Sequence, residues 1–197
     1  AGHIAKHLKR QADLVKQIVR QARARFRSRH LPNKIYSLHE PDVVCIRKNK
    51  TGRPNEYGMK FNLSVDKNGF IVCHESIVGS QHDAKLLDPA VKHWEQVTGQ
   101  LPSQVNGDRG YRQSKRKRMS RRLQAISRLC IPTSGSKKHP DHHRAWFQNG
   151  QRLRAHIEGT IGHIKARGRC RYRGRQGSQI HLSINATCWN LGKLTRL

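Results

Sequence analysis

The chain has 197 residues, a length that suits one domain with a hydrophobic core of its own. Its 40 lysines and arginines outnumber its 12 aspartates and glutamates, and the resulting net charge of +28 is spread over nearly the whole length. The expected partner is therefore a nucleic acid rather than a membrane, since no stretch approaches the ~18 consecutive apolar residues of a membrane span.

The first predicted element in chain order is a long amphipathic helix over residues 4–26. Its apolar residues recur every three or four positions, and its remaining faces are basic. The apolar positions are Ile4, Leu8, Ala12, Val15, Val19, Ala22 and Phe26. Direct contact with DNA and simple solvation explain the basic faces equally well. We take residues 1–30 as this basic helical region and residues 31–197 as the main domain.

A β-hairpin is predicted after an irregular stretch at residues 30–57, where prolines and a glycine interrupt any pattern. Apolar and polar residues then alternate from Met59 to Val65. A turn follows at residues 66–69, and the chain runs back through an apolar segment that ends at Cys73. Alternation on both sides of a short polar turn is typical of a hairpin.

The rest of the chain alternates between helices and short strands. In order, we expect a helix at residues 83–97, a strand at 104–106, a basic helix at 114–123, a strand at 129–132, a helix at 146–165 and a last helix at 178–194. Gly150 is a candidate break in the fifth of these elements. This order of elements predicts a mixed α/β domain.

Two acids stand out among so many basic residues. Asp108 follows the strand predicted at 104–106, and a strand's C-terminal end can present a carboxylate for catalysis or metal binding. A side chain that caps the following turn explains Asp108 as well. Glu158 lies in a predicted helix with Arg154 four residues before it, a spacing that an ordinary surface ion pair also explains.

Taken together, these residues resemble the motifs of insertion-sequence transposases of the DDE class. Residues 107–112 (GDRGYR) are similar to the second-aspartate motif of that family. Arg154-x3-Glu158-x6-Lys165 has the spacing of the arginine, glutamate and lysine in its third-acid signature. The resemblance covers about residues 34–194.

Two further stretches match the family in the same order, at residues 37–42 and 56–60. The sequence also departs from the family in two respects. Gln151 stands where the signature has a tyrosine. Neither Asp13 nor Asp42 lies in a strand-like apolar setting, as the first catalytic aspartate of related transposases does. We therefore expect the first catalytic strand to be absent from this chain.

The resemblance implies an RNase H-like fold, here a mixed sheet flanked by helices that lacks its first strand, with the basic helix as the end of a helical insertion. It implies DNA-mediated transposition through Mg²⁺-dependent strand cleavage and transfer. Asp108 and Glu158 would bind two Mg²⁺ ions in a site that is incomplete without a third carboxylate, and Arg154 and Lys165 would orient Glu158 or neutralise phosphate charge. The partner would be double-stranded DNA, as transposon ends and target, bound by a homodimer at the nucleoid of a bacterial cytoplasm.

Clustered lysines and arginines are candidates for contacts with the DNA backbone, because neutralising phosphates releases their counterions. The candidates are Arg109, Arg112, Lys115, Arg116, Lys117, Arg118, Arg121, Arg122, Arg169, Arg171, Arg173 and Arg175. Solvated runs of charge are the alternative interpretation.

Other site chemistry has less support in the sequence. Five dispersed cysteines without a Cys-x-x-Cys pair favour reduced intracellular thiols over disulfides or a zinc site. The histidines at 139, 142 and 143 lie with Asp141 in a polar loop, which favours a solvated loop over a metal cluster. Asp83 is expected to cap the helix that begins there.

Three functions follow from these patterns. The first is the catalytic domain of a transposase that cleaves donor DNA and joins it to a target. The second is a DNA-binding remnant or regulator that has lost catalysis, which the absent first aspartate favours. The third, a basic RNA-binding protein of ribosomal type, explains the charge but not the ordered motifs.

Overall fold

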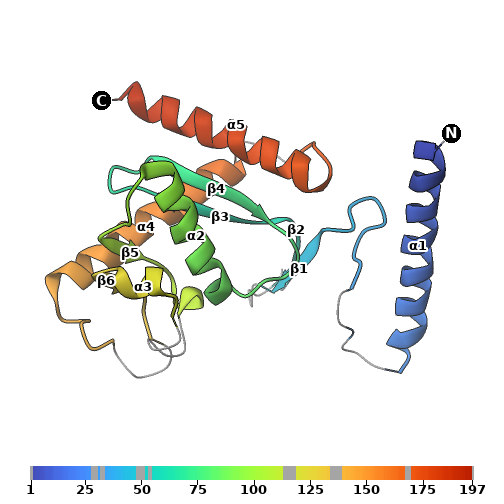
Figure 1. Cartoon of the computed structure of the whole chain (residues 1–197), viewed down its shortest axis with the longest axis horizontal. Coiled ribbons are helices and arrows are strands. Elements are labelled where there is room, and N and C mark those ends of the chain that lie inside the picture. The colour runs from blue at the N-terminus through green and yellow to red at the C-terminus, as the bar shows by residue number, and fades with distance from the viewer. Residues whose placement is uncertain are drawn as a thin grey trace.

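The hairpin predicted from alternating residues forms in the computed structural model (Figure 1). The structure describes residues 2–27, 31, 34–47, 52, 55–112, 119–133, 139–166 and 170–196. β3 (Lys60–Val65) pairs antiparallel with β4 (Ile71–Ile77). In the turn between them, Asp66 Oδ1 accepts the backbone N–H of Phe70 at 2.7 Å, and Gly69 takes a φ of 85°. That positive φ is a conformation that glycine adopts without strain.

The other elements follow the predicted order closely. They are α1 (Gly2–Arg25), β1 (Val44–Arg47), β2 (Asn55–Gly58), α2 (Asp83–Thr98), β5 (Gln104–Asn106), the 3₁₀ helix η1 (Arg109–Tyr111), α3 (Arg121–Ala125), β6 (Arg128–Cys130), α4 (Ala145–Ala166) and α5 (Gly174–Leu194). The predictions for α1, α2, β5, β6 and α4 are confirmed to within a few residues at their ends.

The structure corrects the sequence prediction in three places. Residues 30–57 are not irregular throughout, because β1 and β2 pair antiparallel with Cys45 opposite Tyr57. Helix α4 is not broken at Gly150. Helix α5 begins at Gly174, earlier than the predicted start at 178. Of the basic helix predicted at 114–123, residues 114–118 lie outside the described residues. Residues 119–120 are not helical, because Ser120 is the N-cap of α3, which begins only at Arg121.

The strands of the described residues form three two-stranded ladders. β1–β2 and β3–β4 are antiparallel, whereas β5–β6 is parallel, with Val105 opposite Leu129. The chain is therefore a mixed α/β protein. A single RNase H-like sheet stays a prediction.

Two of the ladders each pack against a hydrophobic cluster. On the β5–β6 side, Leu87 and Val91 of α2 pack with Leu123, Ile126 and Ile131. On the β3–β4 side, buried residues of α4 and α5 pack against the hairpin, and this cluster comprises Ile71, Ile164, Leu182 and Ala186. Helix α4 also contacts β5 and β6, so it links the two halves of the molecule.

Two amide side chains of α5 form hydrogen bonds along the outer edge of β4, which is the edge that does not pair with β3. Asn190 accepts the N–H of Ile71 at 2.8 Å and donates to its carbonyl at 2.8 Å. Gln179 accepts the N–H of Ser76 at 2.8 Å and donates to the carbonyl of His74 at 3.3 Å. The two amides thus take the place of a neighbouring strand, which protects this edge from pairing with another chain.

Helix α1 stands apart from the other helices in Figure 1 and buries none of its residues. Gln21 fastens it to the segment that follows, since its amide accepts the N–H of Ile35 at 2.8 Å and donates to the Ile35 carbonyl at 2.9 Å. Its predicted apolar stripe is exposed, up to 95% at Phe26. In the part of the chain that the structure describes, neither this helix nor any other is long and apolar enough to cross a membrane.

Candidate active site

Asp108 lies just beyond the end of the parallel β5–β6 ladder. The N–H of Gly107 still donates to the carbonyl of Cys130 at 3.1 Å, and the chain then leaves the ladder. Asp108 is exposed, and its Oδ1 accepts the N–H of Gly110 at 2.7 Å, which caps η1. The carboxylate is thus both at a strand end and in a turn-capping position, the two alternatives that the sequence left open.

A second acid, Asp83 at the start of α2, shares the surroundings of Asp108. A Cβ atom on Gly110 would lie 2.6 Å from Asp83 Oδ2 and 3.0 Å from Asp108 Oδ1, so the glycine leaves room for both carboxylates. Burial first, and then the negative charges of Asp83 and Asp108, raise the pKa of Tyr111 to about 12. The Tyr111 hydroxyl donates to Asn62 Oδ1 of β3 at 2.9 Å, which ties η1 to the hairpin.

The expectation that Asp83 caps α2 is wrong, because its carboxylate forms an ion pair with Lys60 of β3. The cap is His82, whose Nδ1 accepts the N–H of Ala84 at 3.2 Å. Lys60 Nζ also donates to the carbonyl of Gln81 at 2.7 Å, so one lysine fastens the start of α2 to the hairpin. No sequence pattern indicates that Asp83 lies close to Asp108, because the contact depends on how α2 packs against η1.

Glu158 lies on α4 and pairs with Arg154, whose Nη1 is 3.1 Å from Glu158 Oε1. The Glu158 side chain is 64% exposed. Arg154 Nε is buried and has no hydrogen-bond partner among the described residues. The pair therefore follows the i,i+4 spacing of a helix, and the Arg154 side chain is less exposed than the Glu158 side chain.

Lys165, two turns after Glu158, lines a groove of about 300 Å³. Ile161 of the same helix also lines it, and Lys60 and Phe61 of β3 lie on the opposite side. The groove connects the end of α4 with Lys60, the lysine that holds Asp83. Lys165 therefore shares this groove with the lysine that pairs with Asp83, while Asp83 itself does not line it.

Each acid has its own partner in the structure, since Asp108 accepts the N–H of Gly110 and Glu158 pairs with Arg154. Residues 2–27, 31, 34–47, 52, 55–112, 119–133, 139–166 and 170–196 contain no group of three or more His, Cys, Asp or Glu side chains that could hold a metal ion. Carboxylates suit Mg²⁺ in kind. However, the resemblance implies a site with three carboxylates, and Asp108 and Glu158 provide only two of them.

The predicted DNA-contact residues fall into three groups. The exposed ones are Arg109, Arg112, Arg121, Arg171, Arg173 and Arg175. Arg122 instead donates from Nε to Glu95 Oε2 of α2 at 2.8 Å, and this hydrogen bond is the main reason that its pKa is raised. Lys115, Arg116, Lys117, Arg118 and Arg169 lie outside the described residues.

Two other sequence observations acquire structural roles. Gln151, at the place of the family tyrosine, donates from Nε2 to the carbonyl of Cys130 at 3.2 Å and so ties α4 to β6. In the histidine-containing loop, His139 stacks on Phe147 with 4.6 Å between ring centroids, and Asp141 pairs with Arg144 at 3.0 Å. All five cysteines are free.

Asp108 and Glu158 are exposed acids, and Arg109 and Arg112 are exposed arginines, on a mixed α/β scaffold. A model of the transposase DDE domain family matches residues 33–191. The chain therefore belongs to this family of DNA-acting transposases. No curated protein and no solved structure matches the chain.

Proposed function

We propose that the chain is the catalytic part of a DNA transposase that cleaves strands at transposon ends and joins them to a target. The supporting observation is the position of two exposed acids, Asp108 at the end of β5 and Glu158 on α4, the helix that packs against that strand. The family match covers both motifs.

In this proposal each charged residue has a distinct task. Asp108 and Glu158 are the metal-binding carboxylates. Arg154 fixes the rotamer of Glu158 through their ion pair, and Lys165 neutralises a phosphate of the bound strand. Mg²⁺ is the proposed cofactor because hard cations take carboxylate oxygens. The described residues contain no group of three such ligands, so Asp108 and Glu158 would hold the metal weakly by themselves.

We further propose that the β3–β4 and β5–β6 ladders are the two halves of one RNase H-like sheet, and that its first strand would lie between β3 and β5. Helix α2 packs on both β3 and η1, and Tyr111 bridges to Asn62, although no backbone ladder connects the halves within the described residues. The outer edge of β4 is closed by α5, so the inner edges are the ones that could accept a strand. Such a strand would also supply the third carboxylate.

A nicking assay on supercoiled DNA, with Mg²⁺ and with Mn²⁺, tests the proposal. We expect little cleavage by the chain alone, because two carboxylates hold two hard cations poorly. Adding an upstream segment with an aspartate in an apolar strand should restore cleavage, and Asp108→Ala or Glu158→Gln should then abolish it.

Robust cleavage by the chain alone, lost on Asp108→Ala, would instead mean that an acid within this chain, such as Asp83, is the third ligand. DNA binding without cleavage, even with the added segment, would favour the DNA-binding remnant or regulator, whose basic surface is the same. Restored cleavage that survives Asp108→Ala would contradict the site assignment.

A further inference from the structure

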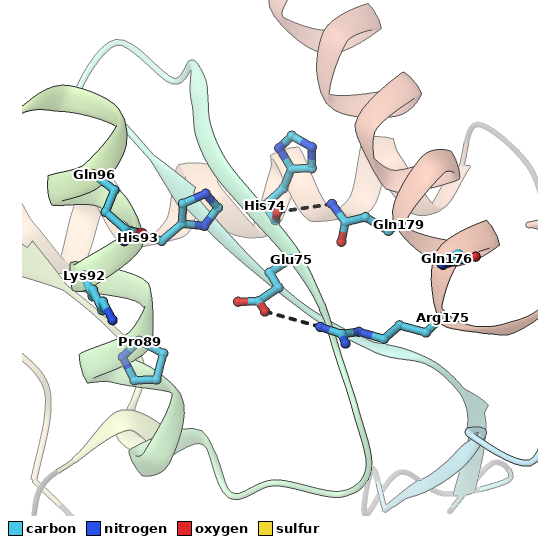
Figure 2. Close-up of a pocket in the computed structure, with 9 residues that line it drawn as sticks. All are labelled: His74, Glu75, Pro89, Lys92, His93, Gln96, Arg175, Gln176 and Gln179. Carbon is cyan, nitrogen blue, oxygen red and sulfur yellow. Dashed lines mark hydrogen bonds and ion pairs between the residues drawn. The ribbon is translucent and has the colours of Figure 1, made fainter.

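An open groove of about 550 Å³ lies between α2, β4 and α5 (Figure 2). None of the residues assigned above to metal binding lines it. Figure 2 shows Lys92 and His93 coming from α2 and Arg175 coming from α5, on either side of Glu75 of β4. Cations therefore enter this groove from two separate helices.

The start of α5 carries positive side chains, although the helix dipole favours negative charge there. Its first turn contains no acid, and its N-cap, Arg173, makes no side-chain capping hydrogen bond. Arg175 lies in the same first turn, where the helix dipole is already positive and favours anions. Two arginines at an uncapped helix N-terminus break a local rule of stability, and such places are often functional.

Little negative charge offsets these cations. Glu75 is the only acid among the described residues that line the groove. Its Oε1 is 3.7 Å from Arg175 Nη2, and both side chains are about half exposed, so the pair is loose. Burial lowers the pKa of His74, which disfavours its charged form, and its Nε2 lies 2.9 Å from Ser183 Oγ.

We propose that this groove binds phosphates of a DNA backbone, apart from the site of Asp108 and Glu158. Lys92 and Arg175 would neutralise phosphates from opposite walls, and the side chains of Gln96 and Gln176 are available there as neutral donors. An open groove suits a polymer better than a small anion. Arg173, which is exposed just before α5, would add a further phosphate contact beside Arg175. This inference rests on the proposed function, since it assumes that the chain binds DNA.

The test is the slope of log Kd against log salt concentration for a short duplex. Each phosphate neutralised contributes about 0.9 to this slope, so Lys92→Ala with Arg175→Ala should lower its magnitude by about 1.8. If the double variant folds poorly, Lys92→Ala alone is the alternative test, because it breaks no described ion pair. It should lower the magnitude of the slope by about 0.9. Lys67→Ala, which removes an exposed lysine of the hairpin turn outside the groove, is the charge-matched control and should leave the slope near the wild-type value.

Glu75→Gln gives a second, opposite readout. Glu75 competes with phosphate for Arg175, so its neutralisation should tighten DNA binding severalfold at low salt. Slopes for the Lys92 and Arg175 variants equal to the wild-type slope would overturn the groove proposal alone and leave the transposase proposal standing. A wild-type chain that binds no duplex DNA at any salt concentration would overturn both.

Discussion

Gly150 shows how one missing side chain fixes the distance between a helix and a ladder. A Cβ atom there would lie 2.4 Å from Asn106 Oδ1 and 2.6 Å from Cys130 Sγ, so only glycine lets α4 approach β5 and β6 this closely. From sequence the same glycine indicated a helix break. A glycine in a helical segment can mark either a helix break or a close approach to a neighbouring element, and only the tertiary contacts distinguish between the two.

Replacing Gly150 by alanine should destabilise the protein by about 1–3 kcal/mol, because the added methyl group overpacks a closed contact. Gly162→Ala is the matched control on the same helix, since a Cβ atom there would have nothing within 4 Å of it. That variant should gain up to about 1 kcal/mol from helix propensity. Urea denaturation measures both, and equal stabilities would mean that α4 can shift away from the ladder at no cost.

The sequence indicates only those candidate-site residues that lie in short motifs, and their roles stay predictions. Asp108 and Glu158 stand out because each has neighbours at fixed spacing. The sequence around Asp83 indicates a helix cap, whereas its approach to Asp108 depends on α2 packing near Gly110. No local pattern encodes that contact.

Elements with strong periodicity were predictable, and those held by distant contacts were not. The hairpin and α2 follow from alternation and from three-or-four spacing. β1 and β2 were missed, because they are four residues each and lie among prolines. The closing of β4 by α5 was missed too, since it depends on hydrogen bonds between residues 119 positions apart, such as Ile71 and Asn190.

The amide side chains of Asn190 and Gln179 allow a test of whether α5 protects the edge of β4. Asn190→Ala and Gln179→Ala should each destabilise the protein by about 1–3 kcal/mol, because each leaves a backbone N–H of β4 without its partner. The double variant should also self-associate through the opened edge. Chemical denaturation and sedimentation velocity measure these effects, and Gln176→Ala, at an exposed glutamine of the same helix, is the control. A double variant as stable and monomeric as the control would show that α5 does not protect the edge.

For the whole molecule, the net charge of +28 favours a polyanionic partner. Within the described residues some cations already have internal partners, and Arg122 is the clearest, with Glu95 at 2.8 Å and Asp88 at 3.7 Å. Its neighbour Arg121 is exposed. Adjacent arginines in α3 therefore have different expected tasks, one in holding α3 to α2 and the other in binding DNA.

We expect the chain to bind duplex DNA with little sequence preference and to lose about 10³-fold or more in affinity between 50 and 200 mM salt, because its contacts are mostly to phosphates. Neutralising Arg116, Lys117, Arg121 and Arg122 together should make this dependence shallower. Arg121→Ala alone should reduce the salt dependence with little change in stability, whereas Arg122→Ala should reduce mainly stability. Affinity that hardly changes with salt, or the reverse division between the two arginines, would contradict this account.

The closing of β4 by α5 also has a consequence for synthesis on the ribosome. The hairpin is complete long before Asn190 is made, and at about 5–20 residues per second the delay is on the order of 10 seconds. Throughout that time a nascent chain exposes an unprotected strand to its neighbours on the same polysome. Slower translation or truncation ahead of the last helix should therefore increase aggregation during expression, even though the finished protein has that edge sealed.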